Sequence, residues 1–215
     1  MIETNRKEIW RYLGYKGREP DGRVKERIEQ CLDRLGRVVT PGFLSDEFDL
    51  AFPGENEMTF AGIRVRSRHL FRNLCGCRRI VLFAATLGIG PDRLIARAGV
   101  NSPSDMVIYQ AAAAAMIESY CDRKNEEIRC MAEEKGLFCR PRFSPGYGDF
   151  ALEYQRELLQ VLGAAKRIGI TLTDSLLMMP SKSVTALIGL SEQDKADGSV
   201  KCMSCEKKDC VFRSE

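Results

Sequence analysis

One segment, residues 102–135, constrains the fold of this chain more than any other. It is rich in alanine, with an unbroken Ala run at 111–115, and it contains no Gly or Pro after Pro103. Alanine has the highest helix propensity, and no helix breaker interrupts the segment. Ser102 supplies an N-cap residue, Pro103 suits a first helical turn, and Gly136 can end the helix. We therefore expect one helix over 102–135, the longest in the protein.

The strands are predicted from apolar runs that end at Gly or Pro. RRIVLFAATLG (78–88) is continuously apolar and rich in β-branched residues, which is typical of a buried central strand. Residues 43–52 and 58–66 flank a turn-like PGEN and fit a hairpin. A further strand is expected at 137–142, and two or three between 169 and 190, where Pro180 interrupts the pattern.

Shorter helices complete the expected fold. Helical spacing of apolar residues predicts them at 5–14, 21–38, 67–74, after Gly90, and at 151–166. Helices and strands follow one another without βαβ repetition. We therefore predict the α+β class: a largely antiparallel twisted sheet packed with helices. Residues 1–190 should form one domain, and residues 191–215 a linker with a Cys-rich C-terminal tail.

Composition narrows the classes of partner and the location. Lys and Arg number 33 against 30 Asp and Glu, and the net charge of +3 is too small to indicate a nucleic-acid or anionic-membrane partner. The N-terminus lacks a signal-peptide layout, and no apolar run reaches the roughly 20 residues of a membrane span. We expect a cytoplasmic protein.

The tail carries a candidate metal site. Cys202, Cys205 and Cys210 form a C-x2-C-x4-C pattern, which is typical of zinc or iron–sulfur sites. Either metal normally needs a fourth ligand, from the remainder of the chain (Cys75, Cys77, Cys130 or Cys139) or from a second chain. Free thiols, and a disulfide or redox role, are the alternatives. The other cysteines suit packing as small reduced hydrophobes, so a disulfide framework is not expected.

The most unusual segment is CRPRFSPGYGD (139–149). Arg142 offers a planar fork suited to a carboxylate, Gly146 permits close approach of a backbone, and Tyr147 combines a stacking surface with a hydroxyl. These groups could hold an amino acid joined to a nucleoside. The alternative is a structural turn in which Arg142 makes a surface ion pair.

The stretch from Arg142 to Tyr147 resembles the Arg-x-x-x-Gly-Tyr signature of the activation domain of cobalamin-dependent methionine synthase, a family that binds S-adenosylmethionine. RIGITLTDSLLMMPSKSVTALIGL (167–190) is similar to the segment that follows in that family. Upstream, RIVLFAATLG (79–88) and AAAAAMIESYCDR (111–123) resemble its apolar strand and its Ala-rich helix. The resemblance covers about residues 75–190.

The resemblance implies roles for particular residues. Arg142 would hold the carboxylate of S-adenosylmethionine, and Tyr147 would act as the catalytic residue near the transferred methyl group. Ser144, Pro145 and Gly146 would contribute loop contacts to the ligand. Glu118 would approach the α-amino group or the sulfonium; the alternative is an ordinary solvated carboxylate.

Other polar residues have less definite roles. The acidic residue that the family uses near its N-terminus, in a segment rich in Trp, Pro and Phe, has no counterpart here; Asp46, Glu47 and Asp49 are candidate substitutes. We expect Asp149 to cap the helix that starts near residue 151. His69, the single histidine, is predicted to be a partly buried helix residue rather than a ligand.

The chain lacks the Asp-x-His-x-x-Gly motif with which methionine synthase carries its corrinoid. The resemblance therefore implies a stand-alone activation subunit that acts in trans. It would support reductive methylation, in which inactive Co(II) on a partner is reduced by one electron and trapped by a methyl group from S-adenosylmethionine. The partners would be a cobalamin-binding methyltransferase, with methionine synthase or a related corrinoid protein as candidates, and a flavodoxin or ferredoxin. The alternative function is a metal-bearing redox or scaffold protein of a corrinoid system that does not use S-adenosylmethionine.

Overall fold

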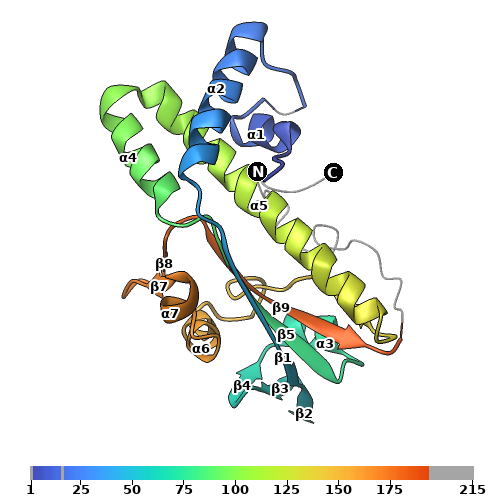
Figure 1. Ribbon diagram of the computed structural model, residues 1–215. Coiled ribbons are helices and arrows are strands. Elements are labelled where there is room, and N and C mark those ends of the chain that lie inside the picture. Colours follow the sequence, from blue (N-terminus) through green and yellow to red (C-terminus); the bar gives the residue numbers. More distant parts are fainter. Residues whose placement is uncertain (1, 16, 194–215) are drawn as a thin grey trace.

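The computed structural model describes residues 2–15 and 17–193 (Figure 1). A four-stranded antiparallel sheet lies at its centre, in the order β1-β5-β9-β6. These strands are β1 (Gly42–Asp49), β5 (Arg79–Thr86), β9 (Ser183–Ser191) and β6 (Phe138–Cys139). The continuous apolar run is therefore an inner strand, as predicted, and β9 is the other.

A layer of helices covers one face of this sheet. It contains α1 (Arg6–Tyr12), α2 (Gly22–Val38), α4 (Gly90–Asn101) and α5 (Pro103–Glu133). The predicted long helix is confirmed: α5 has 31 residues and crosses the molecule diagonally (Figure 1). Side chains alternate along β5, so that Val81 and Phe83 face these helices while Ile80 and Leu82 face the opposite side.

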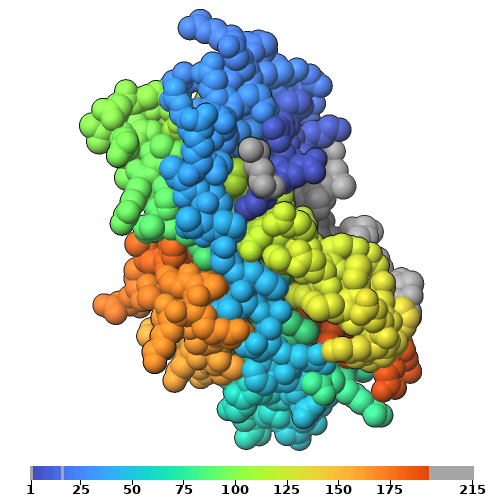
Figure 2. All heavy atoms as spheres, in the orientation of Figure 1, coloured from blue at the N-terminus to red at the C-terminus, as the bar shows by residue number. Residues whose placement is uncertain are grey.

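Smaller elements cover the second face. They are β2 (Ala51–Gly54), β3 (Glu57–Phe60), β4 (Ile63–Arg66), α3 (Arg68–Leu74), α6 (Tyr154–Val161), α7 (Ala164–Ile168), β7 (Thr171–Leu172) and β8 (Met178–Met179). In the space-filling view, α6 and α7 (orange) lie to the left of the blue β1 segment, and the C-terminal half of α5 (yellow) lies to its right (Figure 2). The helices and antiparallel strands confirm the α+β class.

The predicted hairpin between 43–52 and 58–66 is confirmed only next to the PGEN turn, where Ala51 pairs with Thr59, and is wrong for residues 43–49. β1 pairs with β5 along its whole length, and only the continuation β2 pairs with β3. Leu50 separates them, and its N–H donates to the carbonyl of Arg78 at 2.9 Å. The second arm is itself a hairpin, because Ala61 and Gly62 have φ of 50° and 77° and reverse the chain. The apolar alternation of residues 58–66 continues through that turn, so the sequence pattern does not reveal the turn.

Candidate functional site

The loop between β6 and α6 carries most of the predicted binding residues. It is anchored to β9 by two backbone hydrogen bonds between Phe143 and Leu187, of 2.9 and 2.8 Å. Further along, the Gly146 N–H donates to the carbonyl of Phe150 at 2.7 Å and closes a tight turn. Gly146 has φ +89°, a conformation that favours glycine.

The end of this loop is held by Asp149. Its carboxylate accepts hydrogen bonds from the Ser67 hydroxyl at 2.6 Å and from the backbone N–H groups of Arg68 and His69 at 2.8 and 3.0 Å. Asp149 therefore reinforces the N-terminus of α3, whose N-cap residue is Ser67, and not the helix expected near residue 151. That helix, α6, begins at Tyr154 and has no side-chain cap. The prediction that Asp149 caps the helix near residue 151 is wrong, because its carboxylate is used at the N-terminus of α3 instead.

The contacts of Asp149 also define its ionisation. Burial alone would raise the pKa of Asp149, but the hydrogen bonds from Ser67 and from the backbone of His69 and Arg68 lower it to about 2. The Asp149 N–H in turn donates to His69 Nδ1 at 3.3 Å. His69 is a half-buried residue of α3, as predicted, and through this hydrogen bond its ring helps to join the 142–149 loop to α3.

The start of the loop is held by Arg142, whose side chain is only 11% exposed. Its guanidinium carbon lies over the Phe83 ring, 5.7 Å from the ring centroid. Arg142 Nη2 lies 2.6 Å from Asp122 Oδ1 and 3.7 Å from Glu118 Oε2. Arg142 Nη1 is buried and has no hydrogen-bond partner in the structure. One nitrogen of the fork is thus paired, and another is unsatisfied.

Both carboxylates stand on α5, one helical turn apart. The structure brings the predicted Glu118 close to Arg142, and it adds Asp122, which the sequence analysis missed. The only available signal was the spacing of four residues, which puts both side chains on one helix face. Cys121 lies between them in the sequence, and burial raises the pKa of its thiol to about 12.

The remaining predicted residues line the turn itself. Pro145 is buried, Ser144 is half-buried, and the Ser144 carbonyl accepts from the Tyr147 N–H at 3.2 Å. The Tyr147 side chain is exposed, at 67%, and its ring meets Phe143 edge to face at 6.4 Å. The turn thus uses the N–H groups of Gly146 and Tyr147 internally and presents the Tyr147 ring to solvent.

The candidate acidic substitutes lie elsewhere. Asp46, Glu47 and Asp49 are on β1, and β5 and β9 separate that strand from β6. Asp46 pairs with Arg167, and the other two pair with Arg79. The carboxylates that contact Arg142 are instead those of α5.

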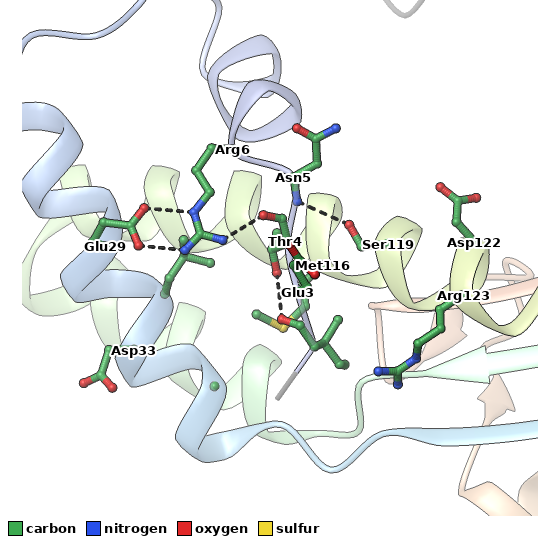
Figure 3. A pocket seen from close by; sticks show the side chains of 13 residues that line it. Glu3, Thr4, Asn5, Arg6, Glu29, Asp33, Met116, Ser119, Asp122 and Arg123 are labelled. Carbon is green, nitrogen blue, oxygen red and sulfur yellow. Dashed lines mark hydrogen bonds and ion pairs between the residues drawn. The ribbon is translucent and has the colours of Figure 1, made fainter.

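An open cavity of about 1290 Å³ lies between the N-terminal segment, α2 and α5 (Figure 3). At one end Arg6 makes an ion pair with Glu29, and at the other stand Asp122 and Arg123. Of the predicted site residues that the structure describes, none lines this cavity. Arg142, Glu118, Asp122 and the 144–147 turn together form what we call the Arg142 cluster. The cavity adjoins this cluster through Asp122, which belongs to both.

Residues 79–199, more than half of the chain, match the family described as the activation domain of vitamin B12-dependent methionine synthase. The chain belongs to this family. The match includes β5, α5, the 142–149 loop and β9, so every element that builds the Arg142 cluster falls within the activation domain.

A solved structure agrees with this assignment. The chain is similar to a crystal structure described as the MetH reactivation domain bound to AdoHcy, with a TM-score of 0.60 and 15% sequence identity. The similarity covers 87% of this chain and 75% of the other. At this identity the likeness establishes the fold alone. No curated protein sequence matches the chain.

Two further predictions concern metals and membranes. Cys202, Cys205 and Cys210 lie outside the described residues, so the tail site stays a prediction. Within residues 2–15 and 17–193, no three or more His, Cys, Asp or Glu side chains are grouped so as to hold a metal ion. In that same part of the chain, no helix has the length and apolar character needed to cross a membrane.

Proposed function

We propose that this activation-domain protein binds S-adenosylmethionine at the Arg142 cluster, formed by Arg142, Glu118, Asp122 and the 144–147 turn. It thereby supports reductive methylation of a cobalamin-carrying methyltransferase, with methionine synthase as the first candidate client. The observation that carries the proposal is the state of Arg142. A mostly buried guanidinium with an unsatisfied nitrogen is costly unless a ligand or a neighbour completes its hydrogen bonds.

Different residues of the Arg142 cluster suit different groups of S-adenosylmethionine. The Arg142 fork suits the amino-acid carboxylate, because guanidinium and carboxylate form short charge-assisted hydrogen bonds. Glu118 and Asp122, beside it, suit the α-ammonium and the sulfonium. Tyr147 stands at the outer end of the turn, where its exposed ring and hydroxyl can contact the methyl group and face an incoming partner.

The chemistry requires positioning rather than proton transfer. A sulfonium is a strong methyl donor and needs no acid or base to leave. Cobalamin would supply the cobalt that accepts the methyl group, and a partner protein would carry it, since the chain's single histidine is engaged with Asp149. We therefore propose action in trans, with a flavodoxin or ferredoxin as the electron donor.

Calorimetric titration of the full chain with S-adenosylmethionine tests the proposal. We expect saturable binding by the wild type and a loss of at least about tenfold in affinity for Arg142→Ala, which removes a charge-assisted contact. Arg142→Met, which keeps an apolar stem over Phe83, should lose affinity to the same extent while retaining the fold. Arg167→Ala removes a comparable paired arginine on the far side of the sheet, and it should bind like the wild type. Equal affinities for all four proteins, or no binding by the wild type, would overturn the proposal.

The tail cysteines add a second proposed property. The C-x2-C-x4-C sequence supports a zinc or iron–sulfur site at Cys202, Cys205 and Cys210. Metal analysis and a visible absorption spectrum of anaerobically purified protein should show a bound metal. The triple Cys→Ser variant should lack it and should still bind S-adenosylmethionine. A metal-free wild type contradicts this part of the proposal.

A further inference from the structure

The end of β9 lies beside the turn that follows α3. Ser191, the last residue of β9, donates a hydrogen bond from its hydroxyl to the carbonyl of Gly76 at 3.2 Å. Cys75 and Cys77 flank Gly76, so the chain leaves the sheet next to two thiols. The residues between Ser191 and Cys202 span about 35 Å when extended, which brings several thiols within reach of the tail. Reach alone therefore does not choose the fourth metal ligand.

Burial excludes half of the described cysteines as that ligand. Cys31 and Cys121 are 1% and 0% exposed and lie in the core between the helices and the sheet. Cys77 is 3% exposed and packs in the core on the opposite face. A thiol enclosed in a core cannot meet a metal ion held by three residues of the tail. The cysteines that are exposed or half-buried are Cys75, Cys130 and Cys139.

The surroundings of Cys130 and Cys139 oppose a thiolate, the form that binds metals. Cys130 stands on α5 with a glutamate at each of the i−4, i−3, i+3 and i+4 positions, and its Sγ lies 4.0 Å from the Oε1 of the first. These glutamates are Glu126, Glu127, Glu133 and Glu134. Cys139 is half-buried, and burial together with the charge of Glu133 raises the pKa of its thiol to about 11.

The surroundings of Cys75 are basic instead. Cys75 is exposed and ends α3, and Arg72 lies in the last turn of that helix, three residues before it. Arg78 follows Cys75 by three residues and is exposed. Among the described residues, neither arginine has an ion-pair partner. Nearby cations without carboxylate partners stabilise a thiolate.

A third arginine at this corner lacks an anionic partner. Arg140 is only 6% exposed, and its Nε is buried without a hydrogen-bond partner. Its Nη2 donates to the Ser191 hydroxyl at 3.3 Å, and that hydroxyl donates to Gly76, the neighbour of Cys75. Within residues 2–15 and 17–193, Arg140 makes no ion pair. A buried guanidinium is costly without a negative group nearby, and a metal ion bound by four thiolates carries net negative charge.

We propose that Cys75 is the fourth ligand of the metal site at Cys202, Cys205 and Cys210, so that the metal fastens the tail beside the end of β9. The inference rests on the tail site of the proposed function and names its missing ligand. Four thiolates suit either zinc or an iron–sulfur cluster, and each thiol loses its proton on binding. The three arginines around Cys75 offset the resulting negative charge.

Alkylation of the full chain tests which thiols hold the metal. Anaerobically purified protein is treated with iodoacetamide as isolated, after a chelator has removed the metal, and after reloading with Zn²⁺. Peptide mass spectrometry then reports the reaction of each cysteine. In the metal-bound forms, Cys75 should react at least about tenfold more slowly than in the metal-free form, together with the tail cysteines. Cys130, which is also exposed, is the internal control and should react alike in all three forms.

Substitution gives an independent measure. Cys75→Ser should lower the affinity for Zn²⁺ by at least about tenfold in competition with a chromophoric chelator, because one of four ligands is lost. Cys130→Ser and Cys139→Ser are matched controls and should keep the wild-type affinity. Circular dichroism of the three variants checks that the fold is retained, which the exposure of Cys75 favours.

The outcomes separate this inference from the tail site itself. If the wild type holds no metal as isolated and binds no Zn²⁺, the tail site fails and Cys75 has no ligand role. If metal is bound but Cys75 stays reactive, or Cys75→Ser keeps the wild-type affinity, the assignment of Cys75 is wrong while the tail site stands. Loss of affinity in Cys130→Ser or Cys139→Ser alone, or a metal-bound dimer that Cys75→Ser leaves unchanged, would overturn it in the same way.

Discussion

The two ends of the 142–149 loop each carry a charged side chain, and the two side chains differ in how completely the fold satisfies their hydrogen bonds. Asp149 receives hydrogen bonds from a hydroxyl and two backbone N–H groups, all within the fold. Arg142 is paired with the exposed carboxylates of Asp122 and Glu118 on α5, and its Nη1 has no hydrogen-bond partner. A charge whose hydrogen bonds are complete is part of the architecture, and one left incomplete is available to a ligand.

The largest contrast should appear in stability. Asp149→Ala leaves the N-cap Ser67 in place but removes the acceptor of two first-turn N–H groups of α3, so we expect the free energy of unfolding to fall by about 2–3 kcal/mol. Arg142→Met should change it by less than about 1 kcal/mol, because the apolar stem is kept and an unsatisfied buried nitrogen is removed. Urea denaturation of both variants measures the difference. Equal losses would remove the distinction between the two ends.

The glycines of the loop sharpen the same contrast. A Cβ on Gly148 would lie 2.5 Å from His69 Nδ1, at φ +56°, whereas one on Gly146 would lie 3.4 Å from its nearest neighbour. Gly148→Ala should therefore cost about 2 kcal/mol, from steric clash and backbone strain together, and Gly146→Ala about 1 kcal/mol from strain alone. Thermal unfolding of the two variants tests this order, and a reversed order would contradict it.

Low pH should destabilise the protein through Asp149, at the end of the 142–149 loop. Its pKa in the folded protein is about 2, below the ordinary value of 3.8. The stabilisation from its ionised form is therefore complete above about pH 4 and is lost as the pH falls toward 2. The stability difference between wild type and Asp149→Asn should shrink over that window by about 1 kcal/mol. Denaturation series between pH 5 and pH 2.5 measure it, and a constant difference would show that the carboxylate charge is not responsible.

The smallest effect on folding is expected for Tyr147→Phe. The ring is 67% exposed and keeps its edge contact with Phe143, so stability should change by less than about 0.5 kcal/mol. If the hydroxyl contacts the bound ligand, affinity for S-adenosylmethionine should fall a few-fold. A stability loss as large as that of Asp149→Ala would place Tyr147 in the architecture instead.

The sequence predicts those helices and strands whose formation depends on residues close together in the chain. The Ala-rich run is sufficient to define α5, and the apolar run defines β5, because helix propensity and strand composition act locally. That Arg142 and Glu118 contribute to the same binding site is predicted only from the family resemblance. Asp122 was missed because its partner is 20 residues away, and Asp149 was given the wrong helix because Ser67 is 82 residues away. Such pairings arise from tertiary packing, which no local pattern records.

The register of β5 with β9 has a kinetic consequence. It pairs Arg79 with Leu190 and Thr86 with Ser183, and α5 and the 142–149 loop both lie in the long intervening stretch of chain. Closing a loop of that length is entropically unfavourable, and contacts so distant in sequence slow folding. Arg142 meets the α5 carboxylates only once those two strands have come together. During refolding, the gain of ligand affinity should therefore lag behind helix formation and would time the moment at which the central sheet closes.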